Sequence, residues 1–337
     1  MNGGAEVFLS NLKPVLELLG FNVYVMVNNS FDQSTYSSEY YSLHEKNFNF
    51  LKPLRLKKFL KEHEIDLIID NRARLNLFKT TVYECVFGST KKIKIIHSYH
   101  IHSYLFKNKT INKLLFTHYS KIVCVSKAIE NLVKKNTGLL NTIHIPNFTP
   151  ITESDETINI NFPYILFYGR FDNESKDLLF LLDSYKNSSL PSNGIHLILM
   201  GDGKDKLTIK EYIKKLNIAD SVAIYPFKSP PFPIVSRALF TVLTSNYEGF
   251  PMAIIESLSL SVPVVSSNFT GVDELLQHKV NGLIVDKDVK EYAKALNDMA
   301  FDKELYYSCK NNCKTSISHL SLNTITKRWS ELIHAII

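Results

Sequence analysis

The stretch Asn246-Tyr247-Glu248-Gly249-Phe250-Pro251-Met252-Ala253-Ile254-Ile255-Glu256 carries the most information about the fold of this 337-residue chain. It follows the apolar run 238–243, which is typical of a buried strand. Pro251 then favours a helix start, because its missing N–H would have no partner at the first helical position. A strand, a glycine turn and a helix N-terminus together form a typical anion-binding site. With two glutamates beside it, this site suits a ligand that has both phosphate and hydroxyl groups, and a nucleotide sugar is such a ligand.

Short apolar runs recur along the whole chain, with helical patterns between them. Continuous apolar runs are typical of parallel strands that are buried on both faces. Alternating strands and helices predict an α/β protein, and the Pro-rich break at 146–150 divides it into two doubly wound parallel-sheet domains. Ligands of such sheets lie beyond the carboxyl ends of the strands. The expected strands are 23–27, 67–69, 93–96, 122–125, 142–145, 164–168, 195–200, 222–225, 240–243, 264–266 and 282–285.

Length and composition are those of a soluble globular protein. A chain of 337 residues is long enough for two domains. Its content of 45% hydrophobic and 21% charged residues is typical of soluble globular proteins. No apolar run approaches the roughly 20 residues needed to span a bilayer, and no signal peptide is expected. The four cysteines lack zinc or redox spacing, so free thiols in a reducing cytoplasm are expected.

Positive charge gathers in the first half of the chain. Residues 1–147 hold 20 Lys and Arg against 11 Asp and Glu, a net charge of +9, whereas the remainder has −3. This excess favours anionic partners such as phosphates or anionic lipid, and a merely solvated basic face is the alternative. The basic helical pattern 53–63 either covers a sheet or docks on a membrane surface. No nucleic-acid motif is present, so nucleic acid is not an expected partner.

The start of the chain has an unusual order of predicted elements, because a Gly-rich loop comes first and no strand precedes it. Gly3 and Gly4 belong to a Gly-rich loop that runs directly into an amphipathic helical pattern. Such a loop normally follows a strand, and no residues remain before it to form one. The first domain is therefore expected to lack its first strand. The polar and aromatic segment 28–50 has no clear period and indicates a long loop or small excursion.

Two cations are candidates for phosphate binding in the second domain. Gly169 and Arg170 end the strand 164–168, and Lys176 follows six residues later. Each charge-assisted hydrogen bond to a phosphate contributes on the order of 1.5–3 kcal/mol. Together the two cations would neutralise a diphosphate without a metal ion. A surface arginine and lysine in a turn is the alternative interpretation.

The two glutamates of the quoted stretch suit hydroxyl groups. Glu256 is placed to accept hydrogen bonds from the two ribose hydroxyls, and Glu248 from those of a transferred sugar. Backbone groups between them would face the phosphate or the sugar; these belong to Gly249, Phe250, Pro251 and Met252.

Other glycine and proline loops in this domain give weaker signals. Gly201 and Gly203 end the strand 195–200, but no third glycine follows at dinucleotide spacing, so an NAD site is disfavoured. The turn at Gly201 is expected beside a nucleotide. Phe227 lies in a Pro-rich loop that either pairs with a base edge or is a plain connector.

Histidines and arginines mark the strand ends of the first domain. His97 and His100 follow the strand 93–96, where no fixed carboxylate accompanies them, so a metal site is disfavoured. His97 is expected to hydrogen-bond the transferred sugar or to orient the acceptor, and His100 is expected to bind the acceptor; ordinary loop histidines are the alternative interpretation. Arg72 and Arg74 follow the strand 67–69 and would receive an anionic acceptor; a structural pair with Glu84 is the alternative.

These motifs, in this order, resemble those of the family 4 retaining glycosyltransferases. The resemblance rests on Glu248…Glu256, Gly169-Arg170…Lys176, Gly201-Asp202-Gly203, Val264-Val265-Ser266-Ser267 and Asn281-Gly282-Leu283-Ile284-Val285, with Gly3-Gly4-Ala5-Glu6, the His97 strand end and Val125-Ser126-Lys127 in the first half. It covers nearly the whole chain. Two departures are the spacing from Arg170 to Lys176, one residue longer than usual, and the absent first strand.

The resemblance implies a GT-B fold, with two Rossmann-like domains that face a cleft. It implies an acceptor-binding domain at 1–147, a nucleotide-sugar domain at 148–318, and a last helix at 319–337 that crosses back to the first domain. Transfer would be metal-independent and would retain anomeric configuration, with no cofactor. Arg170 and Lys176 would hold the diphosphate, Glu256 the ribose, and Glu248 and His97 the sugar.

The expected activity is hexosyl transfer from a UDP-sugar, or a GDP-sugar, to a glycan acceptor. The acceptor would be lipid-linked or part of a lipopolysaccharide or capsule, in bacterial surface polysaccharide synthesis. The protein would be cytoplasmic and peripheral on the inner face of the plasma membrane. The alternatives are a GT-B sugar-nucleotide epimerase and a truncated, non-catalytic nucleotide-sugar-binding protein.

Overall fold

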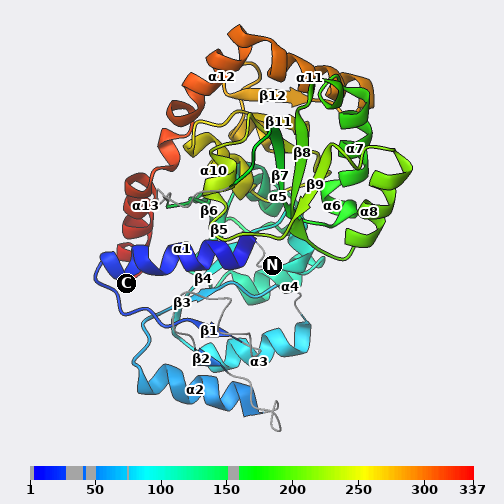
Figure 1. The fold of residues 1–337 in the computed structure, drawn as a ribbon. Coiled ribbons are helices and arrows are strands. Elements are labelled where there is room, and N and C mark those ends of the chain that lie inside the picture. The colour runs from blue at the N-terminus through cyan, green and yellow to red at the C-terminus, as the bar shows by residue number, and fades with distance from the viewer. Residues whose placement is uncertain (1–3, 28–40, 43–50, 74–75, 151–158) are drawn as a thin grey trace. The chain divides into compact units, whose positions relative to one another are not determined.

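The computed structural model describes residues 4–27, 41–42, 51–73, 76–150 and 159–337. The chain divides into two compact units (Figure 1). The C-terminal unit comprises residues 149–321. The N-terminal unit combines residues 2–148 with 322–337, so the chain returns to it at the end.

A six-stranded parallel sheet forms the centre of the C-terminal unit, in the order β12-β11-β10-β7-β8-β9. Its strands are β7 (Tyr164–Arg170), β8 (His196–Asp202), β9 (Val222–Tyr225), β10 (Thr241–Leu243), β11 (Val264–Ser267) and β12 (Gly282–Val285). The helices are α6 (Asn173–Lys176), α7 (Leu178–Asn187), α8 (Lys206–Lys215), α9 (Phe232–Val235), α10 (Met252–Ser259), α11 (Val289–Phe301) and α12 (Lys303–Ser316). Short 3₁₀ turns occur at Pro191–Asn193, Val272–Glu274 and Ser318–Leu320.

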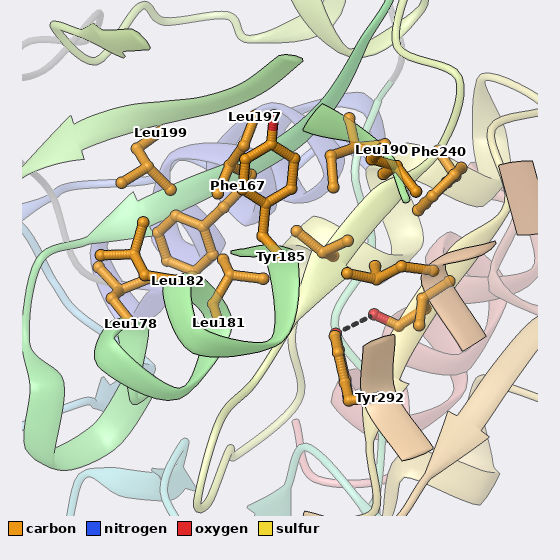
Figure 2. Packing of buried hydrophobic residues seen from close by; sticks show 14 of the residues in the cluster. Phe167, Leu178, Leu181, Leu182, Tyr185, Leu190, Leu197, Leu199, Phe240 and Tyr292 are labelled. Atoms are coloured by element: carbon orange, nitrogen blue, oxygen red, sulfur yellow. Dashed lines mark hydrogen bonds between the residues drawn. The ribbon is translucent and has the colours of Figure 1, made fainter. Parts of the chain in front are cut away.

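The core of this unit lies between the sheet and its helices (Figure 2). Leu178, Leu181 and Leu182 of α7 are fully buried in one cluster with Phe167 of β7 and Leu197 of β8. Burying each such side chain contributes about 1.5–3 kcal/mol. Both faces of the central strands are covered, which is why β7 and β8 read as continuous apolar runs.

A four-stranded parallel sheet, in the order β3-β4-β5-β6, forms the centre of the N-terminal unit. Its strands are β3 (Leu67–Asp70), β4 (Lys91–Ile96), β5 (Lys121–Cys124) and β6 (Thr142–His144); β1 (Met26–Val27) and β2 (Tyr41–Ser42) form a separate parallel pair. The helices are α1 (Gly4–Leu18), α2 (Lys52–Glu62), α3 (Leu77–Phe87), α4 (Lys109–Phe116), α5 (Lys127–Thr137) and α13 (Leu322–His334), with a 3₁₀ turn at Ile101–Ser103. The ring of Trp329 on α13 is fully buried and lies 6.3 Å from that of Phe8 on α1.

The expected α/β class and the parallel sheets are confirmed, with three local differences. Residues 23–25 precede β1 instead of joining it, so that strand is shorter than predicted. Gly4 belongs to the first turn of α1, whereas a loop was expected. Pro251 is the residue before α10, which begins at Met252. Among the described residues, no helix combines the length and the apolar character that crossing a bilayer requires.

Substitution of Tyr292 on α11 can show how much its hydroxyl contributes to the stability of the C-terminal core (Figure 2). Its buried hydroxyl lies 2.9 Å from the carbonyl of Leu243 in β10 and 2.8 Å from that of Val265 in β11. Tyr292→Phe leaves these carbonyls without that donor and should lower the free energy of unfolding by about 1–3 kcal/mol. Urea unfolding measures the loss. Tyr307→Phe, at a ring that is 57% exposed, is the matched control, and an equal effect of both changes would contradict the prediction.

Candidate functional site

The loops after β7 and β10 are joined at the carboxyl edge of the C-terminal sheet, where these two strands are neighbours. Thr244 Oγ1 donates to the carbonyl of Lys176 at 2.8 Å. The N–H of Asn246 donates to the carbonyl of Ser175 at 2.9 Å, and the Asn246 side chain donates to the carbonyl of Glu174 at 2.8 Å. These bonds hold the residues around Lys176 against the start of the Glu248 loop.

Lys176 and Glu248 form an ion pair across this junction. Lys176 Nζ donates to Glu248 Oε1, and Ser245 Oγ donates to the same oxygen at 2.6 Å. The two charged side chains keep only 19% and 13% of their surface exposed, so the pair is better shielded from water than an ordinary surface salt bridge. The sequence placed both residues near a ligand but did not predict that they bind each other.

Glu256 is buried on α10, the helix that follows the Glu248 loop in the chain. Burial raises the pKa of Glu256 to about 7, and a hydrogen bond from Tyr168 opposes that rise. Tyr168 also lies 2.9 Å from the carbonyl of Ala253, so it fastens the end of β7 to the first turn of α10. A buried carboxylate with few partners is well suited to accept hydrogen bonds from ligand hydroxyls.

Arg170 and the two glycines lie where β7 and β8 end side by side. Arg170 is exposed at the last position of β7. Gly169 is paired in register with Gly201 of β8, and a Cβ on Gly201 would come within 2.0 Å of the Gly169 carbonyl oxygen. The close approach of the Gly169 backbone therefore explains why residue 201 is a glycine.

The remaining predicted donor residues lie on the same unit. Phe227 is partly buried and packs against a cluster that includes Tyr168 and Ile234. Phe250 and Pro251 are buried, whereas Gly249 and Met252 keep some exposure at the start of α10.

Lys287 is a charged residue that the sequence did not single out. Its Nζ donates to Asp177 Oδ2 at 2.5 Å, to Asn246 Oδ1 at 2.5 Å and to the Thr244 carbonyl at 3.2 Å. This lysine thus holds the loops after β7 and β10 together from the side of β12. Its position directly after a strand and a loop aspartate was the only signal that could have indicated it.

His97 is held in an apolar setting at the carboxyl end of β4, in the N-terminal unit. Its ring lies 4.9 Å from that of Phe8, and neither ring nitrogen has a hydrogen-bond partner among the described residues. Burial and the nearby Lys94 lower the pKa of His97 to about 3, so the ring is neutral at pH 7. A neutral imidazole offers one donor and one acceptor to a ligand.

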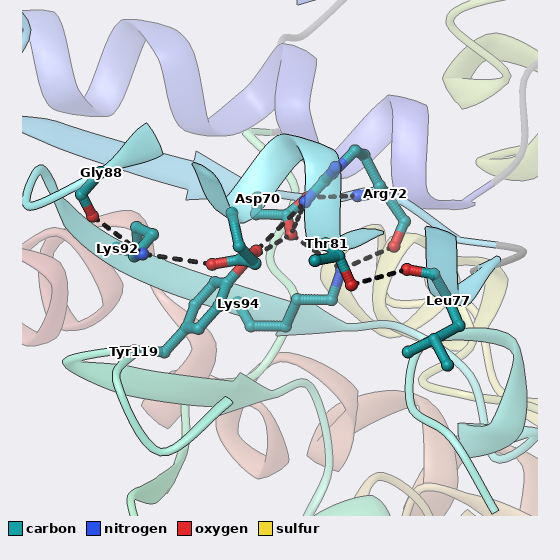
Figure 3. A network of polar contacts seen from close by, with 9 residues as sticks. Asp70, Arg72, Leu77, Thr81, Gly88, Lys92, Lys94 and Tyr119 are labelled. Atoms are coloured by element: carbon teal, nitrogen blue, oxygen red, sulfur yellow. Dashed lines mark hydrogen bonds and ion pairs between the residues drawn. The ribbon is translucent and has the colours of Figure 1, made fainter. Parts of the chain in front are cut away.

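Arg72 belongs to a buried network of charges instead of pointing into solvent (Figure 3). Its guanidinium donates two hydrogen bonds to the carboxylate of Asp70, at 2.8 and 3.0 Å, and lies 3.7 Å from Glu84. The fully buried Lys94 donates to Asp70 at 3.1 Å, and the single hydroxyl of Tyr119 lies within hydrogen-bonding distance of both acids, 3.0 Å from Asp70 Oδ2 and 2.7 Å from Glu84 Oε1. Burial opposes ionisation of Asp70, but Lys94 and Arg72 hold its pKa well below the usual range. This geometry favours the structural interpretation of Arg72.

Three other predicted residues carry less information. His100 is exposed in the loop after β4, where its N–H donates to Ser98 Oγ at 3.1 Å. Arg74 and Gly3 lie outside the described residues, as does most of the segment 28–50.

Comparison with known proteins shows which family the chain belongs to. The sequence profile of glycosyl transferases group 1 matches residues 150–316, and that of glycosyltransferase family 4 matches residues 2–152. The chain is a group 1 glycosyltransferase of family 4. The matches extend over both sheets, and the Lys176–Glu248 pair lies within the group 1 match.

Characterised and solved relatives span most of this glycosyltransferase. The chain is 28% identical over 348 residues to a 4-α-N-acetylgalactosaminyltransferase of Campylobacter jejuni, named for a diphospho-undecaprenol-linked sugar, with 93% of this chain and 91% of that protein covered. It is 27% identical over 264 residues to the lipopolysaccharide 1,6-galactosyltransferase of Escherichia coli K12, at 72% and 67% coverage. HepE of Anabaena, solved with UDP, superposes with a TM-score of 0.81 at 19% identity, covering 99% of this chain and 96% of that one. The glycosyltransferase has the GT-B fold, which the HepE structure shares.

Arg72→Gln distinguishes a structural arginine from an acceptor-binding one. Removing one partner of a buried charge network should cost about 3 kcal/mol of unfolding free energy, because Asp70 loses two hydrogen bonds. Urea unfolding measures this, with the exposed Lys79→Gln as control. Unchanged stability together with a raised KM for acceptor would contradict the structural role.

Glu256→Gln tests the burial of that carboxyl group. Its pKa is about 7 in the folded protein against an ordinary value of 4.5, so folding takes up a proton between these values and wild-type stability falls as pH rises through that window. Glutamine does not titrate. The stability of the variant relative to wild type should therefore increase by up to about 3 kcal/mol from pH 5 to pH 8.

Urea unfolding at both pH values checks this difference. Glu211→Gln, at an exposed position of α8, is the control and should show no such trend. A Glu256→Gln difference that does not change with pH would mean that Glu256 is ionised in the folded protein at pH 5.

Proposed function

We propose that this glycosyltransferase moves a hexose-type sugar from a UDP-sugar to a lipid-linked or lipopolysaccharide-type or capsular glycan, with retention of anomeric configuration. The observation that carries the proposal is the grouping of Lys176, Glu248 and Glu256 at one sheet edge. It provides a cation for phosphate and two carboxylates for hydroxyls: Lys176 and Glu248 lie in the joined segments, and Glu256 lies on α10. The UDP in the HepE structure and the acceptors in the names of the bacterial relatives support the choice of donor and acceptor.

Each donor-site residue has a separate task in this proposal. Glu256 accepts hydrogen bonds from the ribose hydroxyls, and Glu248 from those of the sugar. Arg170 and Lys176 stabilise the negative charge that develops on the leaving diphosphate, so that no metal ion is needed for this task. The acceptor hydroxyl attacks from the face that the diphosphate leaves, and the departing phosphate takes its proton.

Lys176 must exchange partners during this cycle. Its ammonium is bound by Glu248 in the structure, whereas the proposal requires it at a phosphate. The sugar then supplies hydroxyl donors to the carboxylate that the lysine releases. Glu248 thus acts as a binding and electrostatic group, and no covalent intermediate on it is proposed.

His97 provides the contact from the N-terminal unit. A ring that stays neutral at pH 7, with unpartnered nitrogens, can donate to or accept from a sugar hydroxyl. We assign it to the transferred sugar. Because His97 does not titrate near neutrality, its contribution should not vary with pH between 6 and 8.

The charge of the N-terminal unit supports the proposal that the protein is anchored at an anionic membrane surface. Helix α2 exposes Lys57, Lys58 and Lys61, and its Leu54 is 64% exposed beside them. Cationic side chains with a projecting apolar one are typical of helices that lie on lipid headgroups. These features support our proposal that the protein lies at the cytoplasmic face of the membrane, where a lipid-linked acceptor is accessible.

Glu248→Gln should separate phosphate binding from transfer. Without the carboxylate, Lys176 loses an ion pair worth about 1 kcal/mol, so the affinity for free UDP should rise about fivefold. Transfer should fall, because the sugar loses a charged acceptor. Isothermal titration with UDP measures the first effect and product formation the second. Unchanged or weaker UDP binding would contradict the competition between Glu248 and phosphate.

The function itself is tested by release of UDP from UDP-sugars in the presence of a membrane lipid extract. The wild type should release UDP and label the lipid fraction, and Glu256→Ala should lose at least about tenfold in kcat/KM, since about 1.4 kcal/mol of binding corresponds to that factor. Glu211→Ala is the exposed control. A free epimerised sugar without acceptor would instead indicate an epimerase, and no turnover with bound nucleotide would indicate a binding protein.

A further inference from the structure

No polar contact fixes the orientation of the His97 imidazole in the described part of the chain. Both ring nitrogens are buried, and neither has a hydrogen-bond partner among the described residues. An imidazole that acts on a ligand is usually oriented by a hydrogen bond from its other nitrogen to a carbonyl or carboxylate. The torsion that turns the ring is broad and roughly two-fold, so the packing around His97 has to determine where each nitrogen points.

Phe8 of α1 packs directly against this ring. Its side chain is fully buried, and its ring centroid lies 4.9 Å from that of His97 at an interplanar angle of 63°. This is an edge-to-face arrangement, within the separation of about 4.5–7 Å at which aromatic pairs attract each other. Because the edge and the face of an aromatic ring carry opposite partial charges, the contact favours one orientation of the imidazole over others.

Phe8 is itself held by two further rings. The ring of Phe148 lies 6.4 Å from it, the indole of Trp329 on α13 lies 6.3 Å from it, and both side chains are fully buried. Asn11, one turn further along α1, donates from Nδ2 to the carbonyl of Phe148 at 3.1 Å. We call Phe8, Phe148 and Trp329 the ring cluster. It joins three segments that are far apart in the sequence, and side chains in such close-packed surroundings rest in single rotamers.

The surroundings of His97 fix its charge as well. None of the side chains in the ring cluster ionises near neutral pH. Burial is the largest cause that lowers the pKa of His97 to about 3, and Lys94 on β4 is the charged group that adds to it. Since the imidazole stays neutral, its use to a ligand depends on where its one donor and one acceptor point.

We propose that Phe8 is a positioning residue for His97: its ring fixes the orientation in which the imidazole presents a donor and an acceptor to the transferred sugar. Phe148 and Trp329 hold Phe8 in that place. Phe8 acts through the imidazole and not by contact with the reacting atoms. This inference rests on the role of His97 in the proposed function.

A double-mutant cycle of Phe8→Leu and His97→Ala tests this in the transfer assay. Leucine keeps position 8 apolar and largely filled but has no ring that could orient the imidazole. Phe8→Leu should lower kcat by about tenfold, because a small misplacement of a group at the sugar is costly. The Kd for UDP should not change. In the His97→Ala background Phe8→Leu should cause no further loss of kcat, since its effect passes through His97.

Phe116→Leu is the matched control for this cycle. Phe116 is another fully buried phenylalanine of the N-terminal unit, on α4, and its effect on kcat should be the same with and without His97. Phe8→Met also fills position 8 without a ring, and it replaces the leucine variant if that one does not fold.

NMR relaxation of the protein with ¹³C-labelled histidine gives a second readout that does not depend on activity. The order parameter of the His97 ring should be about 0.85 in the wild type, as in rigid groups, and below about 0.6 in Phe8→Leu. Phe116→Leu should leave it unchanged.

Two results would overturn the proposal. One is an equal loss of kcat from Phe8→Leu with and without His97, and the other is a His97 ring that stays as rigid in Phe8→Leu as in the wild type. An unchanged kcat in His97→Ala would instead refute the role of His97 in the proposed function, while the order parameter would still show whether Phe8 orients the ring. The two failures are therefore distinguishable.

Discussion

The ion pair between Lys176 and Glu248 is the interaction on which the proposed site depends. It connects residues 72 positions apart, and the hydrogen bonds of Thr244 and Asn246 fix both loops around it. Lys287, which follows β12, also donates hydrogen bonds to Asp177 and Asn246 in these segments. The pair keeps a cation and an anion together at one sheet edge, so that each charge compensates the other.

Buried polar groups are used in two different ways in this protein. In the N-terminal unit Asp70, Arg72 and Lys94 satisfy one another, which favours a role in stability. Glu256 and His97 are buried with few partners, and burial disfavours the charged form of both. Groups with few partners have hydrogen-bonding capacity left for a ligand, and on this ground we propose Glu256 and His97 as site residues and Asp70, Arg72 and Lys94 as structural ones.

The sequence predicted the strands of both sheets to within a few residues, because buried parallel strands read as continuous apolar runs. It also predicted that Glu248, Glu256, Arg170 and Lys176 gather on one unit, since the carboxyl ends of neighbouring strands share an edge. It did not predict the Lys176–Glu248 pair, which depends on loop geometry, or the packing reason for Gly201. Lys94 in the middle of an apolar strand was an overlooked signal of a buried ion pair.

The most direct test is a crystal structure of the protein with UDP. We expect Lys176 Nζ to leave Glu248 and to lie within hydrogen-bonding distance, about 2.7–3.2 Å, of a phosphate oxygen. Glu256 should contact the ribose hydroxyls in the same structure. UDP bound with Lys176 still paired to Glu248, and with its phosphates held elsewhere, would contradict the central claim.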